Sequence, residues 1–143
     1  MNDMLSGLPR RLWWALASAA LMVIAGFAPW ATALDTISVS GTDGDGWFVI
    51  VGGAIAGALL WRHARSGARG LAIGAAVIGA LCTLIALYDL SDVNDVADAA
   101  GLGSVIDPGW GLYLAIVASV SLTAASVVAL RAGRATTTVT PVG

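Results

Sequence analysis

The chain has 143 residues, of which 58% are hydrophobic and 11% are charged, and its formal net charge is −2. Because soluble domains carry about 25% charged residues, this composition excludes an ordinary soluble domain and indicates an integral membrane protein. Every acid is Asp and every base is Arg, which together with the high Ala and Gly content is typical of a high-GC genome, such as an actinobacterial one. We expect no nucleic-acid partner.

Four apolar stretches are long enough to be membrane helices, because about 20 residues cross a ~30 Å hydrocarbon core. They predict spans at about residues 11–34, 45–64, 69–89 and 109–131. The expected fold is therefore an all-α integral membrane domain over residues 1–134, a four-transmembrane-helix bundle. The remaining residues, 135–143, are expected to form a flexible cytoplasmic tail.

The first span contains two local features. Pro29 removes a backbone hydrogen bond, so we expect a bend or early unwinding near that end of the helix. Ala31-Thr32-Ala33 resembles a signal-peptide cleavage site, but the apolar run before it exceeds the roughly 7–15 residues of a signal peptide. We therefore expect this helix to be retained.

The next loop, residues 35–46, is acidic and rich in glycine. Alternation of Ile and Val with Ser over Thr36–Ser40 predicts a short extended segment, and residues 41–46 predict a turn. Asp43 and Asp45 are candidate metal ligands, because Asp-x-Asp-Gly is a fragment of a calcium-binding loop. That loop also requires a Glu, which the chain lacks. We therefore expect no metal or other cofactor, and favour an acidic surface that faces solvent or a partner.

Small residues recur at a spacing of four in the later spans, where they let helix backbones approach closely. They predict packing faces, either within one bundle or against another subunit. The positions are Gly53, Gly57, Gly70, Gly74, Gly79, Gly111, Ala115 and Ser119.

The loop between the third and fourth spans, residues 89–109, is also acidic. Ser91 or Asp92 is a candidate helix N-cap and Gly101 a candidate stop, with apolar residues on one helical face between them. We expect a short amphipathic helix that lies on the outer face of the membrane.

The charges sort by loop, with Asp3 as the exception. The positive-inside rule predicts both termini in the cytoplasm and the acidic loops 35–46 and 89–109 outside, in a bacterial cytoplasmic (inner) membrane. The arginines are expected to contact anionic lipid in the inner leaflet. They are Arg10, Arg11, Arg62, Arg65, Arg69, Arg131 and Arg134.

Tryptophans flank the spans, as expected for side chains that anchor a helix at the membrane–water interface. The expected anchors are Trp13, Trp14, Trp30, Trp47, Trp61 and Trp110.

The two halves of the chain resemble each other. Each has a Gly-Trp pair before its second span, Gly46-Trp47 and Gly109-Trp110, and each ends in Arg-x-x-Arg. This pattern favours a tandem repeat of two helical hairpins. The alternative is that the general composition of membrane proteins produces the likeness.

Reactive groups are scarce. The spans contain no ionisable side chain away from their ends, and such groups usually mark ion or proton paths. His63 is expected to contact solvent or lipid head groups, and the single cysteine, Cys82, to pack in the core. We therefore expect no catalytic residues and no enzyme.

Three motifs carry a family resemblance: APW at residues 28–30, DGDGW at 43–47 and PGWGLYLA at 108–115. The chain resembles small four-span actinobacterial membrane proteins, among which the tryptophan-associated transmembrane proteins are a named group. The resemblance implies this topology and source, and no established activity.

The leading functional hypothesis is a non-catalytic accessory, assembly or scaffold subunit of a larger membrane complex, with lipids and other membrane-protein subunits as partners. One alternative is a lipid- or quinone-binding membrane sensor. The other is a homo-oligomeric channel or small-solute permease, lined by the hydroxyls of Ser18, Thr32, Thr83, Ser119, Ser121, Thr123 and Ser126.

Overall fold

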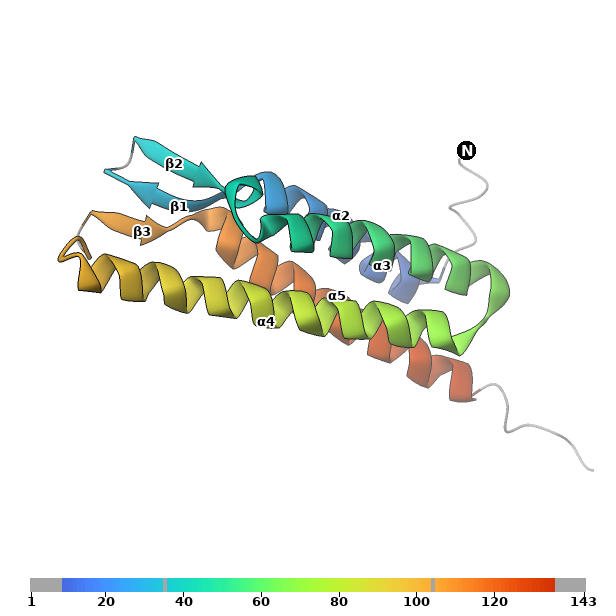
Figure 1. The fold of residues 1–143 in the computed structure, drawn as a ribbon. Helices are drawn as coiled ribbons and strands as arrows, with labels where there is room; N and C mark the ends of the chain where they lie inside the picture. Colours follow the sequence, from blue (N-terminus) through green and yellow to red (C-terminus); the bar gives the residue numbers. More distant parts are fainter. Residues whose placement is uncertain (1–8, 35, 104, 136–143) are drawn as a thin grey trace, which may run out of the picture.

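Four long helices form an antiparallel bundle in the computed structural model, which describes residues 9–34, 36–103 and 105–135 (Figure 1). They are α2 (Arg10–Phe27), α3 (Gly46–Ser66), α4 (Arg69–Ala99) and α5 (Trp110–Ala135). Each is long and apolar enough to cross a membrane, which confirms the prediction of four such helices. The predicted tail lies outside the described residues, apart from Ala135, which ends α5.

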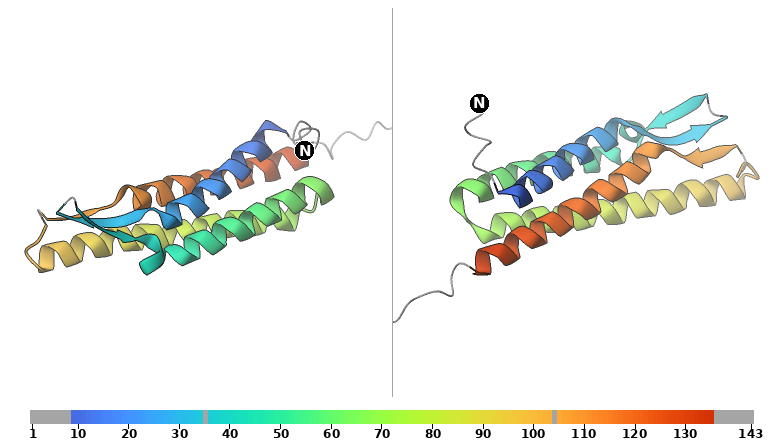
Figure 2. Two further views of the ribbon diagram at one scale, coloured as in Figure 1. Left: turned by 90° about the horizontal axis from the view of Figure 1, so that it is seen from above. Right: turned by 180° about the vertical axis from the view of Figure 1, so that it is seen from behind.

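The helices pack as a ring in chain order, so that α2 contacts α3 and α5, and α4 contacts the same two helices (Figures 1 and 2). Alanines and glycines line most of the contacts, which lets the backbones approach closely. A few larger side chains fill the interior, and each is fully buried: Met22, Val49, Leu60, Leu112 and Leu122.

A ring of hydrogen bonds joins α2 to α5. The Ser18 hydroxyl donates to the Trp14 carbonyl at 2.9 Å, and the Trp14 indole Nε1 donates to Ser121 Oγ at 2.7 Å. Ser18 and Ser121 lie 2.9 Å apart. Because Ser18 has already given its single proton to Trp14, Ser121 is the donor in this pair. Every polar group of the ring thus has a hydrogen-bond partner within the protein.

The first helix is shorter than predicted. It ends at Phe27 rather than near residue 34, because Ala28 is extended and Pro29 cannot continue a helix. The predicted early unwinding at Pro29 is therefore confirmed, and the following residues form a strand instead of more helix. This strand is β1 (Pro29–Ala33).

A three-stranded sheet covers this end of the bundle, and the all-α prediction missed it. The strand order is β2-β1-β3, with β2 at Ile37–Ser40 and β3 at Ile106–Pro108. Both pairings are antiparallel, and Ala31 faces Val39 on one side and Pro108 on the other. The extended segment predicted at residues 36–40 is confirmed as β2. We call this the sheet end of the bundle, and the opposite end, where α2 and α4 begin, the arginine end.

A short 3₁₀ helix, η1 (Gly41–Asp43), links β2 to α3. Ser40 starts it with reciprocal hydrogen bonds, since its hydroxyl accepts from the Thr42 amide at 3.3 Å and its own amide donates to Asp43 Oδ2 at 3.2 Å. This arrangement is a capping box, which satisfies the free amides at a helix start. The turn predicted at residues 41–46 is built around it.

The predicted amphipathic helix on the outer face is instead a straight continuation of α4. Helix α4 has 31 residues, or about 46 Å, which exceeds a ~30 Å hydrocarbon core. Ser91 does not cap a new helix, because its hydroxyl donates to the Tyr88 carbonyl within the same one, at 2.7 Å. The predicted stop at Gly101 is confirmed: this residue has φ 67°, and its amide donates to the Asp98 carbonyl.

Candidate functional site at the sheet end

Trp30 is the centre of the junction between the bundle and the sheet. Its side chain is only 6% exposed, and its indole Nε1 donates to the Ala25 carbonyl at 2.9 Å. That carbonyl belongs to the last turn of α2, and it also accepts from the Ala28 amide at 3.2 Å. Trp30 was predicted to be an interfacial anchor, but the structure buries it, because the strands fold over it.

Glycines let two other segments reach this tryptophan. The Gly41 amide donates to the Ala28 carbonyl at 3.1 Å, and the Gly109 amide donates to the Trp30 carbonyl at 2.7 Å. A Cβ atom at Gly41 would lie 2.5 Å from Trp30 Nε1, and one at Gly111 would lie 2.5 Å from the Ala28 Cβ. Two of the motifs that carry the family resemblance, residues 28–30 and 108–115, therefore meet here, and Gly41 lies two residues before the third.

An acidic recess of about 270 Å³ opens beside this junction. Four carboxylates line it, two from the loop before α3 and two from α4. They are Asp43, Asp45, Asp89 and Asp92. Asp43, Asp45 and Asp92 are exposed, and Asp43 also accepts a hydrogen bond from the Ser40 amide in the capping box.

Asp89 differs from the other three. It is the first residue of the predicted outer loop 89–109, where the apolar part of α4 meets its acidic extension. Its Oδ2 atom is buried and has no hydrogen-bond partner among the described residues. Burial, and then the charges of Asp45 and Asp92, raise the pKa of Asp89 from 3.8 to about 6. Sequence reasoning missed this residue, because its surroundings come from a loop far away in the chain.

The recess does not have the arrangement of a metal centre. Within the described residues, no group of three or more His, Cys, Asp or Glu side chains is placed to hold a metal ion. The candidate ligands Asp43 and Asp45 lie at the edge of the recess with water-exposed side chains. Asp35, which begins the same loop, lies outside the described residues.

The hairpin of β1 and β2 presents apolar side chains to its surroundings. Leu34 is 66% exposed and Ile37 is 61% exposed, and Val39 is exposed beside them. We call these three residues the hairpin tip. Strand β2 is an edge strand of the sheet. Alternation of apolar and polar residues usually means one buried face, yet no face of β2 is buried over Ile37–Val39.

Leu34 also has an unusual backbone. Its φ is 53°, the left-handed region, and it is the only described residue other than glycine with a positive φ. This conformation is unfavourable for a side chain with a Cβ atom. Strained residues concentrate at functional sites, so an exposed leucine in this conformation marks the hairpin tip as a candidate contact surface.

The predicted small packing residues divide into two groups. A Cβ atom at Gly53 would lie 2.9 Å from the Ala19 carbonyl of α2, and one at Gly79 would lie 2.5 Å from Thr123 Oγ1 of α5. Gly111, Ala115 and Ser119 are buried in the same way within the bundle. Gly70 is exposed, and a Cβ atom there would meet nothing within 4 Å. Gly57 and Gly74 are half-buried.

The remaining tryptophans lie at the two ends of the bundle. Trp13 and Trp14 are exposed near the start of α2, and Trp61 is half-buried at the same end, where the Arg65 guanidinium lies 4.9 Å from its ring centre. Trp47 and Trp110 are exposed at the starts of α3 and α5, at the sheet end.

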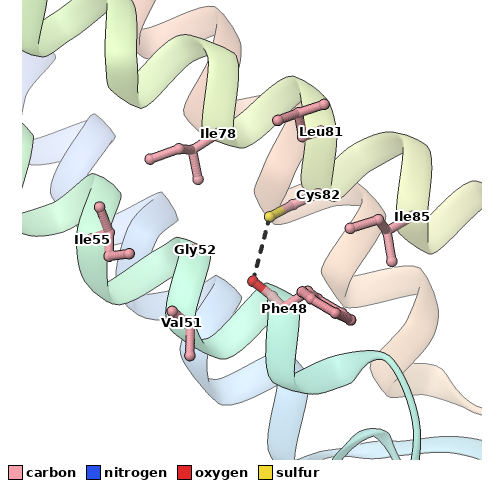
Figure 3. A pocket seen from close by; sticks show the side chains of 8 residues that line it. All are labelled: Phe48, Val51, Gly52, Ile55, Ile78, Leu81, Cys82 and Ile85. Carbon is pink, nitrogen blue, oxygen red and sulfur yellow. Dashed lines mark hydrogen bonds between the residues drawn. The ribbon is translucent and has the colours of Figure 1, made fainter.

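A groove of about 230 Å³ runs between α3 and α4 on the side of the bundle (Figure 3). Its walls are apolar side chains, including Phe48, Ile55 and Leu81. The Cys82 thiol is the one reactive side chain among the residues that line the groove, and it donates to the Phe48 carbonyl at 3.7 Å (Figure 3). With no polar group to orient a ligand, this groove resembles a surface for lipid chains more than a specific site.

Comparisons with protein-family models, with curated proteins and with solved structures find no match to this chain.

Proposed function

We propose that this chain is a non-catalytic accessory or scaffold subunit of a larger assembly in a bacterial cytoplasmic membrane, and that it joins the assembly through the hairpin tip. The observation that carries this proposal is the exposed, strained Leu34 beside Ile37 and Val39 on an edge strand. Apolar groups exposed together on an ordered element are typical of contact surfaces.

The charges support an orientation. Every described aspartate lies at the sheet end or on the part of α4 that extends toward it, and the arginines lie at the opposite end. By the positive-inside rule, the sheet end faces the outside and both termini face the cytoplasm. The partner surface is then on the outer side of the membrane. It presents an apolar pocket for the hairpin tip, flanked by basic groups that complement the acidic recess.

The other two hypotheses receive less support. Four of the hydroxyls expected to line a channel bond one another between helices: Ser18 bonds Ser121, and Thr83 donates to Ser119 at 2.9 Å. A pore between copies would need a polar lining on the outside of the bundle. Thr83 and Thr123 line an open recess there, but its other walls, which include Leu84 and Val120, are apolar. A quinone or lipid sensor would need polar groups in a groove such as the one in Figure 3.

The test is purification of the full chain from native membranes in mild detergent, with crosslinking and mass spectrometry. We expect one partner in constant ratio to the wild-type chain. The variant L34G relieves the positive φ and removes the apolar side chain, so it should remain folded and lose the partner. The neighbouring variant S38A alters an exposed polar residue of the same hairpin and should keep the partner. Recovery of the chain alone, or equal recovery of a partner with L34G, would contradict the proposal.

A further inference from the structure

We propose that the arginine end holds a binding site for the phosphate of an anionic lipid head group. The site is a recess of about 360 Å³ between the first turn of α2 and the last turn of α3. Arg11 and His63 supply its polar wall, and Leu12, Ala64 and Ala129 supply its apolar wall. We call it the arginine-end recess. It is separate from the hairpin tip and does not depend on the function proposed for it.

The His63 ring is oriented by the backbone. Its Nδ1 lies 2.9 Å from the Ala68 carbonyl oxygen. A carbonyl oxygen only accepts hydrogen bonds, so Nδ1 carries a proton. The second nitrogen, Nε2, has no hydrogen-bond partner among the described residues. The ring is therefore fixed in place with one nitrogen left for a ligand.

The surrounding backbone is also suited to an anion. Helix α2 begins without a side-chain cap, so its first amides add partial positive charge to the recess. The end of α3 presents carbonyl oxygens, which would repel an anion, but two of them already accept hydrogen bonds within the protein. The His63 carbonyl accepts from the Gly67 amide at 2.9 Å, and the Arg62 carbonyl accepts from the Ser66 hydroxyl at 2.9 Å.

No described carboxylate neutralises this end of the bundle, because all the described aspartates belong to the sheet end or to the extension of α4. The described charged side chains at this end are therefore all arginines, and Arg11 is the one that lines the recess. The guanidinium group has the planar fork of donors that matches a phosphate.

The apolar wall favours a lipid over free phosphate. Leu12 and Ala129 are buried, and the neighbouring Trp13 and Trp14 are exposed on the outside of α2. Tryptophan at such a position sits at head-group level in a membrane. A phosphate that carries acyl chains can therefore enter the recess while its chains follow the side of the bundle.

The test uses the full chain purified in mild detergent, and native mass spectrometry that counts bound phosphatidylglycerol and phosphatidylcholine. We expect the wild-type chain to retain phosphatidylglycerol in preference to phosphatidylcholine. The variant R11Q/H63Q should lower this retention at least about tenfold, since losing even one charge-assisted hydrogen bond has about that effect. The matched control R131Q removes an exposed arginine at the same end but outside the recess, and should change retention less than about twofold.

Three results would overturn the proposal. One is equal loss in R131Q and R11Q/H63Q, which would mean diffuse attraction to charge. Another is binding of inorganic phosphate as tight as that of phosphatidylglycerol, which would mean a free-phosphate site. The third is unchanged retention in R11Q/H63Q. Circular dichroism checks that the double variant keeps its helices. If it does not, the single variants decide, with R11Q and H63Q each expected to lower retention of phosphatidylglycerol.

Discussion

The amide of Gly109 donates a 2.7 Å hydrogen bond to the carbonyl oxygen of Trp30. This bond joins the start of α5 to β1, and it brings together residues from opposite halves of the chain. Gly41 completes the junction from the other side through its bond to the Ala28 carbonyl. The sheet end is thus one connected unit, in which the position of the hairpin tip depends on how closely the backbone approaches Trp30.

The variant G41A tests this dependence. An added Cβ would lie 2.5 Å from Trp30 Nε1 and 2.6 Å from the Gly26 carbonyl, and neither group can move freely. We expect a loss of about 1–3 kcal/mol of stability, as for other overpacked sites, measured by unfolding in detergent. The control is G44A in the same loop, where a Cβ would meet nothing within 4 Å. Equal stability of the two variants would show that the junction adapts.

The contact between α4 and α5 makes a second prediction. A Cβ at Gly79 would lie 2.5 Å from Thr123 Oγ1 and 3.1 Å from the Ser119 carbonyl. We expect G79A to lose about 1–3 kcal/mol. G70A in the same helix should lose nothing, because a Cβ there meets open space. The measurement is helix content by circular dichroism as a denaturing detergent is added. A greater loss in G70A would point instead to a contact with another chain.

The four helices could be predicted from the sequence, because the length of an apolar run is a local property. Their ends were harder to predict. APWATAL after Phe27 is as apolar as the helix before it, so hydropathy did not separate β1 from α2. The break expected at Ser91 did not occur, because a serine hydroxyl within a helix can bond to that helix's own carbonyls.

The sheet and the acidic recess depend on contacts that no local pattern contains. Strand β3 has only three residues, and it pairs with a strand more than 70 residues earlier, as Thr32 with Asp107. Trp30 has the sequence context of an interfacial anchor, and only this pairing buries it. In the same way, the raised pKa of Asp89 depends on burial and then on the charges of Asp45, which comes from a distant loop, and of Asp92.

The hydroxyl ring between α2 and α5 makes a third prediction. We expect S18A and S121A each to lower stability, and the double variant to lose less than the sum, because both remove the same 2.9 Å bond. The coupling should be about 0.6 kcal/mol and at most about 1.7 kcal/mol, the range for side-chain hydrogen bonds in membranes. A double-mutant cycle in detergent measures it. Strict additivity would mean that the two hydroxyls act separately.

The pKa of Asp89 makes the last prediction. The raised pKa means that the folded protein disfavours the charged carboxylate, mainly through burial and then through Asp45 and Asp92. Below the ordinary pKa of 3.8 the group is neutral in both states and carries no penalty. As pH rises through about 6, the penalty develops fully and the folded state loses stability.

The neutral variant D89N removes this penalty. We therefore expect D89N to have a higher Tm than wild type at pH 7.5, with the difference shrinking as pH falls below about 6 and disappearing near pH 4. The control is D95N, which removes an exposed charge from the same extension of α4 outside the recess. It should leave the Tm difference small at every pH. A D89N effect that is independent of pH would mean that Asp89 is ionised at no cost. A lower Tm of D89N at pH 7.5 would mean that the Asp89 carboxylate has a partner in the folded protein.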